Sequence, residues 1–138
     1  MVAQIAVLAL SLLGLVLSAL VTLVGAGIVR GEDPRLPRWC RFDEHGCAGV
    51  FRSPDAKLFW IPNAVLGLCY YGALIAITLV RDLLSDLAGF LVVLGAFTVV
   101  VGIYLTARLV LVHRVRCDVC LASHCVNLLL FVTFLAGL

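Results

Sequence analysis

Charged side chains are scarce in this sequence, and long stretches lack them completely. Asp, Glu, Lys and Arg make up 13% of the 138 residues, whereas 64% are hydrophobic. Soluble domains have roughly 25% charged and 45–50% apolar residues, so this composition excludes an ordinary soluble domain. The basic residues form no basic helix face, which excludes a nucleic-acid-binding surface. The length suits one domain, residues 1–138.

Four stretches without Asp, Glu, Lys or Arg are long enough to cross a bilayer, which takes roughly 20 apolar residues. The first lacks the basic start of a signal peptide and far exceeds its apolar core of roughly 7–15 residues, so we expect it to be retained. We predict transmembrane helices over about 5–29, 58–80, 87–107 and 117–138. The predicted fold class is an all-α integral membrane protein, a bundle of four transmembrane helices.

The main polar segment, residues 30–57, holds six basic and five acidic residues and is predicted to form a loop that caps the bundle. Ser53-Pro54-Asp55 resembles a helix N-cap, a proline at the first position and an acidic first turn. It predicts a short interfacial helix carrying Phe59 and Trp60, aromatics that favour the membrane interface. Residues 108–116 are predicted to join the third and fourth helices.

Six cysteines remain to be explained, because a disulfide-stapled secreted fold would be polar and rich in loops. With four helices, the loop 30–57 and the connection 108–116 lie on the same side. Cys40 and Cys47 belong to the first, and Cys117 and Cys120 follow the second. Two cysteine pairs therefore meet at one membrane face. Two further cysteines within helices, Cys69 and Cys125, are expected to be inert apolar residues.

Cys117-x-x-Cys120 at a predicted helix N-terminus indicates redox chemistry. The free N–H groups and positive dipole there, with Arg116, favour the reactive thiolate, although Asp118 partly opposes it. Two alternatives remain open. The pairs could be inert structural disulfides, or the four thiolates could bind zinc, although the Cys40 to Cys47 spacing is wider than is usual for zinc.

Helical spacing places Cys117, Cys120, His124 and Asn127 on one stripe of the last helix. Polar groups in membrane helices usually face the bundle interior. Asn63, Gly67 and Tyr70 form a comparable stripe on the second helix. Together these stripes are suited to a flat apolar ligand with carbonyl oxygens. Alternatively, Asn63 caps its helix and His124 makes an interhelical hydrogen bond.

These residues resemble the vitamin K epoxide reductase family of membrane thiol oxidoreductases over most of the chain. The resemblance rests on the order and spacing of Cys40, Cys47, Val50-Phe51, Ser53, Pro62-Asn63, Gly67, Tyr71 and Cys117-x-x-Cys120. It implies that Cys120 is the active-site cysteine beside a quinone and that Cys117 is its partner, able to pair with Cys47. Cys40 would exchange with a thioredoxin-like protein.

The resemblance also implies a quinone site formed by Asn63, His124, Phe51 and Tyr71, with Ser53 in support. Animal members carry tyrosine where this chain has His124, which can still hydrogen-bond a quinone oxygen but adds a titrating group. Since many prokaryotic members carry a fused thioredoxin-like domain and this chain ends at Leu138, we expect a partner in trans, membrane lipid around a monomer, and no metal.

The implied reaction is a relay. A reduced partner attacks Cys40–Cys47, Cys47 attacks Cys117–Cys120, and Cys120 passes two electrons to a quinone of the ubiquinone or menaquinone type. We rank quinone-coupled disulfide formation above reduction of vitamin K quinone or its epoxide.

The arginines bear on the orientation of the protein in the membrane. Family habit places the cysteine face outside the cytoplasm, where disulfides persist. Lys and Arg, however, are usually in excess in cytoplasmic loops, and this face holds nine of the ten, against Arg81 alone on the opposite side. We therefore predict an inverted topology, with the cysteines facing the cytosol.

Overall fold

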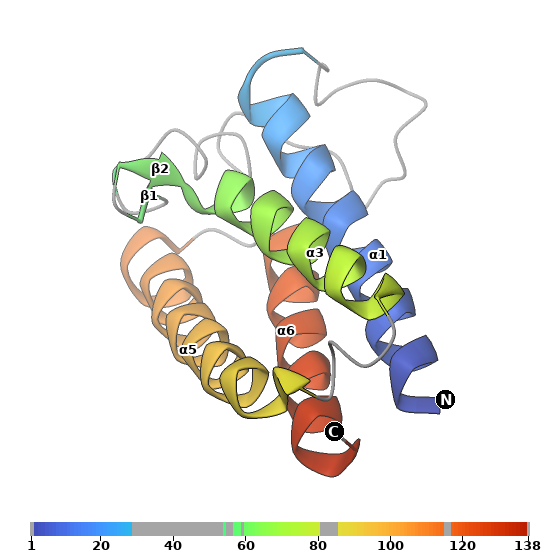
Figure 1. Cartoon of the computed structure of the whole chain (residues 1–138). Coiled ribbons are helices and arrows are strands. Elements are labelled where there is room, and N and C mark those ends of the chain that lie inside the picture. The colour runs from blue at the N-terminus through green and yellow to red at the C-terminus, as the bar shows by residue number, and fades with distance from the viewer. Residues whose placement is uncertain are drawn as a thin grey trace.

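The described part of the chain folds into a bundle built from the helices α1, α3, α5 and α6 (Figure 1). The computed structural model describes residues 2–28, 54, 57–58, 60–80, 86–114 and 117–137. In chain order the elements are α1 (Val2–Gly25), β1 (Lys57–Leu58), β2 (Ile61–Pro62), α3 (Asn63–Leu79), α5 (Ala88–Ala107), the π-helix η3 (Arg108–His113) and α6 (Asp118–Gly137). The all-α bundle predicted from the apolar stretches is confirmed.

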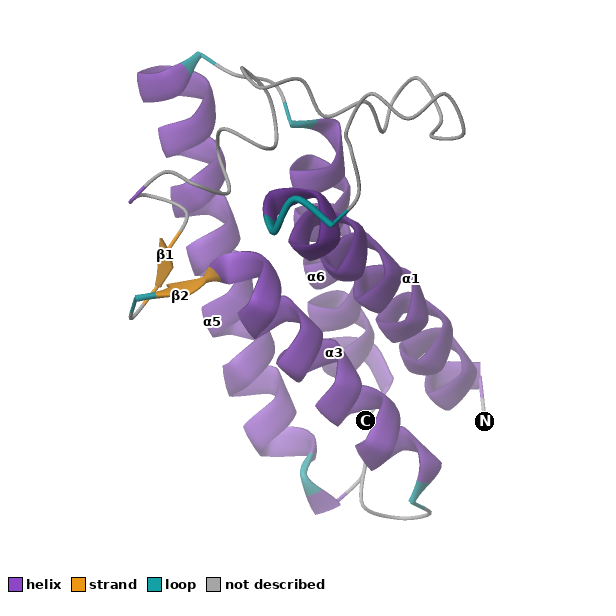
Figure 2. Cartoon of the chain, turned by 90° about the horizontal axis from the view of Figure 1, so that it is seen from above, coloured by secondary structure: helices purple, strands orange, loops and turns teal. Residues whose placement is uncertain are grey.

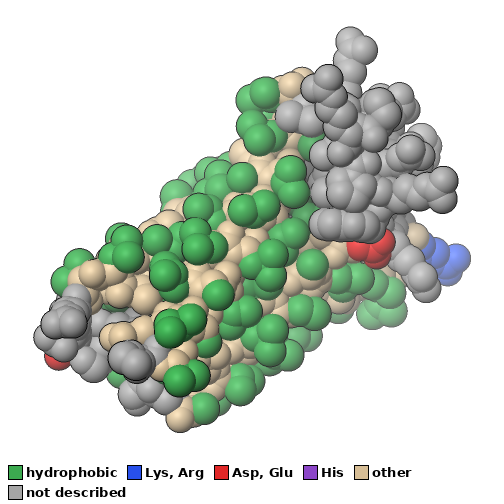
Figure 3. All heavy atoms as spheres, turned by 90° about the vertical axis from the view of Figure 1, so that its right-hand side faces the viewer, with side chains coloured by type: hydrophobic (Ala, Val, Ile, Leu, Met, Phe, Trp, Pro, Cys, Tyr) green, Lys and Arg blue, Asp and Glu red, His purple; other side chains and the backbone are tan. Residues whose placement is uncertain are grey.

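Among the described residues, three helices are long and apolar enough to cross a membrane: Val2–Gly25, Ala88–Val112 and Asp118–Ala136. The fourth, α3, has 17 residues and begins at Asn63, after the predicted start at residue 58. The visible face of the bundle carries many apolar side chains (Figure 3), and large hydrophobic residues are exposed along α1, α5 and α6 and at the end of α3. Such a surface is stable only in lipid, so the chain is an integral membrane protein.

The helix α6 lies at the centre of the packing. It packs against α1 and α5, while α3 packs mainly against α1 and makes few direct contacts with α5 (Figure 2). Buried residues from all four helices form the core, including Val7, Leu74, Leu91, Leu130 and Phe134. The α6 helix thus packs against α1 and α5, and it reaches α3 through the Tyr71 side chain.

Small residues let α1 approach α3 closely. A Cβ on Gly14 would overlap the ring of Tyr71, and a Cβ on Gly67 would lie 2.6 Å from the Ser18 hydroxyl oxygen. The α1 helix ends at Gly25, and Gly27 in the following turn has a φ of +75°, the left-handed conformation that glycine adopts without strain. Close backbone approach thus replaces large apolar side chains at this interface, as is common between membrane helices.

The expected interfacial helix does not extend over Trp60. Lys57 pairs with Pro62 and Leu58 with Ile61 in an antiparallel hairpin, and Trp60 in its turn has a φ of 69°. This left-handed conformation interrupts a helix, and the aromatic and β-branched residues around it favour strands. Phe59 lies outside the described residues.

The predicted connection 108–116 is also partly wrong. Residues Arg108–His113 continue α5 as a π-helix, which ends where the backbone N–H of Arg114 donates to the carbonyl of Leu109. The run Leu109–Val112 is apolar, and backbone groups at membrane depth must be paired internally. Continuing the helix satisfies them, whereas an open loop would not.

Candidate redox site

A disulfide joins Cys117 and Cys120 at the N-terminus of α6. Their Cα atoms lie 5.2 Å apart, Cys117 is fully buried and Cys120 is partly buried. The backbone N–H of Cys120 donates to the Cys117 sulfur over 3.3 Å. This donor and the helix dipole stabilise negative charge on sulfur. The pair can therefore open to a thiolate at the end of a membrane helix.

His124 follows Cys120 by four residues, so it lies on the same side of α6 and about 6 Å further along the axis. Its ring packs against Gly102 of α5, where an added Cβ would lie 2.8 Å from Nδ1. Nδ1 is buried and has no hydrogen-bond partner in the described part of the chain. The rest of the residue keeps some exposed surface. The site therefore contains a polar group that no described neighbour satisfies.

Asn127 connects α6 to α3 rather than to α5. The Tyr71 hydroxyl donates to Asn127 Oδ1 over 2.7 Å and lies 3.4 Å from the Ser123 carbonyl oxygen. The Tyr71 side chain is 2% exposed and ties the two helices together. The residues of the predicted α6 stripe thus diverge: His124 contacts α5 and Asn127 contacts α3.

The stripe predicted on α3 diverges as well. Gly67 faces Ser18 of α1, whereas the Tyr70 hydroxyl is buried with no hydrogen-bond partner among the described residues. Asn63 is the first residue of α3 and partly buried. The cap position belongs to Pro62, with no side-chain cap hydrogen bond, so the alternative role of Asn63 as the N-cap does not hold.

Four predicted site residues lie outside the described part of the chain: Cys40, Cys47, Phe51 and Ser53. Within the described residues, Cys69 and Cys125 are free and exposed, and no group of three or more His, Cys, Asp or Glu side chains gathers to hold a metal. A four-cysteine zinc site would need Cys40 and Cys47, which lie outside the described residues, so that alternative stays a prediction.

Sequence reasoning missed Gly102 and the bond between Tyr71 and Asn127. A single glycine inside an apolar helix gives no indication of which residue packs over it. Tyr71 was expected beside a quinone because of the family resemblance, and Asn127 on a stripe with the cysteines. Their pairing depends on how α3 and α6 are rotated, which periodicity alone does not determine.

The fold and the site together define a class: an integral membrane helical bundle with a dithiol–disulfide pair at the end of one helix. The model of the vitamin K epoxide reductase family matches residues 5–135, nearly the whole chain, and the chain belongs to this family. No curated protein sequence matches it. Family membership indicates a membrane oxidoreductase of the thiol–disulfide or quinone kind.

Proposed function

We propose that this protein is a quinone-dependent thiol oxidoreductase that oxidises a thioredoxin-like partner through its cysteines. The observation that carries the proposal is the Cys117–Cys120 disulfide at the start of α6, with the partly buried His124 one turn deeper on the same helix. A disulfide there is the oxidised state that a dithiol donor would consume. A polar group below it is what a quinone carbonyl oxygen would require.

The proposed reaction has two balanced halves. In the first, two thiols of the partner become a disulfide, the electrons pass through Cys40–Cys47, and Cys117–Cys120 opens to two thiols. In the second, re-forming Cys117–Cys120 releases two electrons and two protons, which a bound quinone accepts to become the quinol. Asn63 and His124 would hold the quinone oxygens, and the buried sulfur of Cys117 keeps the exchange away from water.

The test uses the full chain in lipid nanodiscs, with a dithiol donor and a short-chain ubiquinone or menaquinone analogue. Quinone reduction is followed by absorbance. Cys120→Ala removes the thiol proposed to face the quinone and is expected to abolish reduction. Cys125→Ala, an exposed free cysteine on the same helix, is the matched control and should keep wild-type activity. Wild-type protein that reduces no quinone would contradict the proposal, as would stoichiometric bound zinc.

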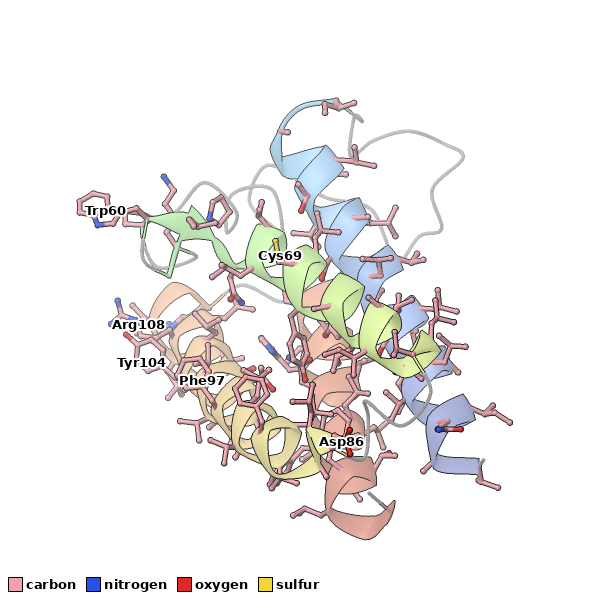
Figure 4. The ribbon with its side chains drawn as sticks, in the orientation of Figure 1. Trp60, Cys69, Asp86, Phe97, Tyr104 and Arg108 are labelled. Carbon is pink, nitrogen blue, oxygen red and sulfur yellow. A yellow bond between two sulfur atoms is a disulfide. The ribbon has the colours of Figure 1, made fainter. Side chains whose placement is uncertain are left out.

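We also propose that the cysteine face is cytosolic. Lys57, Arg108 and Arg114 belong to the elements at the end of the bundle where α6 begins, while Asp86 lies at the opposite end (Figure 4). Lys and Arg concentrate on the cytoplasmic side of membrane proteins. A reporter fused after Leu138 should therefore be found outside the cytoplasm. A cytoplasmic reporter would overturn this orientation.

A further inference from the structure

We infer that Gly102 of α5 holds His124 as the tautomer with its proton on Nε2, so that the imidazole is a hydrogen-bond donor through that nitrogen. The two residues are in close contact. The position of an added Cβ on Gly102 lies 2.8 Å from Nδ1 and 3.3 Å from Cγ of the ring. In glycine this direction is occupied by a Cα–H bond, which therefore points at Nδ1.

The contact discriminates between the two neutral tautomers. A Cα–H group is a weak donor that can meet a nitrogen lone pair, whereas an N–H pointing at it would find no acceptor. Nδ1 is buried without a hydrogen-bond partner among the described residues. An Nδ1–H would be a buried donor facing another hydrogen, whereas an unprotonated Nδ1 keeps the weak Cα–H contact. Nδ1 is therefore the unprotonated nitrogen, and Nε2 carries the proton.

Nε2 lies across the imidazole ring from Nδ1, so an Nε2–H points away from Gly102. Nδ1 is enclosed, but His124 as a whole is only partly buried, so its exposed surface lies away from Nδ1. His124 shares a side of α6 with Cys120. The role of the imidazole rests on the proposed function. The Nε2–H is the donor to the quinone oxygen, and Gly102 is a positioning residue that acts through His124 without touching the quinone.

The tautomer is measured without any quinone. The full chain is prepared in nanodiscs with ¹⁵N-labelled histidine, and the signal of His124 among the three histidines is assigned as the one lost in His124→Gln. The neutral ring is expected to show the Nε2–H pattern of nitrogen shifts and couplings. Gly102→Ala, whose Cβ displaces the ring, should change this pattern. Gly89→Ala on the same helix, with no atom within 4 Å of its added Cβ, should not. An Nδ1–H pattern in the wild type would overturn the inference.

Activity supplies the second arm. His124→Gln keeps an amide donor near the position of Nε2, whereas His124→Asn places it near Nδ1, so Gln should retain more quinone reduction than Asn. Gly102→Ala is expected to slow reduction about 3- to 10-fold, the effect of one hydrogen bond. It should have no more than about a twofold effect in a His124→Ala background. If the double variant loses as much activity as the product of the Gly102→Ala and His124→Ala losses, Gly102 does not act through His124. Wild-type protein with the Nε2–H pattern but no quinone reduction would refute the proposed function alone.

Discussion

Removing the Tyr71 hydroxyl should destabilise the bundle by about 1 kcal/mol. The Tyr71→Phe change keeps the ring, so it leaves the packing over Gly14 intact and opens no large cavity. What is lost is the 2.7 Å bond to Asn127 Oδ1, which lies in the normal O–H···O range. The 3.4 Å approach to the Ser123 carbonyl is too long to add much.

The expected magnitude follows from this single bond. A neutral hydrogen bond contributes about 0.5–1.5 kcal/mol net, and interhelical bonds in a membrane average about 0.6 and reach about 1.7 kcal/mol. The free energy of unfolding is measured by titrating SDS into mixed micelles, with helix content followed by circular dichroism. Tyr104→Phe deletes the same atom from a side chain that is 59% exposed on α5, and it should have almost no effect.

A double-mutant cycle identifies the partner. In an Asn127→Leu background the acceptor is already absent, so Tyr71→Phe should cost much less than in the wild type. The reasoning would be refuted if the loss were the same in both backgrounds, or if it were no greater than that of Tyr104→Phe. Either result would mean that the bond does not hold α3 to α6.

Two further predictions concern packing and redox state. Gly14→Ala, whose Cβ would overlap the Tyr71 ring, should lower the free energy of unfolding by about 1–3 kcal/mol. Gly72→Ala, which meets no atom within 4 Å, is the control and should raise it by up to about 1 kcal/mol. Equal effects of the two changes would contradict the close contact between Gly14 and Tyr71. The oxidised protein is treated with N-ethylmaleimide, and labelled cysteines are identified by digestion and mass spectrometry. Cys117 and Cys120 should stay unlabelled until a reductant is added, because both sulfurs are in the disulfide. A label on either cysteine before reduction would argue against that disulfide.

The length of the uncharged stretches predicted the bundle well, because four such stretches leave few other ways to satisfy the backbone in lipid. Local signals were less reliable. Ser53-Pro54-Asp55 predicted a helix running through Trp60, yet Trp60 lies in the turn of a hairpin. The strand-forming character of the residues around Trp60 was available in the sequence. The capping pattern at Ser53-Pro54-Asp55 favoured a helix instead, but such a pattern stabilises only the first turn of a helix.

The contacts of the site depended on information that one sequence does not carry. Spacing placed Cys120, His124 and Asn127 along one side of a helix, but that side is wide enough to meet two neighbours. Gly102 contacts His124 and Tyr71 bonds Asn127 because of how α3 and α5 are rotated around α6. Those rotations are set by close approach at small residues, whose effect appears only when both helices are in place.

Because the disulfide and the imidazole belong to the same helix, their separation along the axis is fixed by helix geometry at about 6 Å. Substitutions on neighbouring helices can change how His124 is oriented, but they cannot change its register relative to Cys120. The two neighbours should therefore have separable effects. Removing the Tyr71 bond on α3 should weaken the hold on α6 and lower stability, whereas altering Gly102 on α5 should displace the imidazole and change the reaction with the acceptor. A redox centre carried on one central helix allows this separation, since the helix provides the distance and its neighbours provide the orientation.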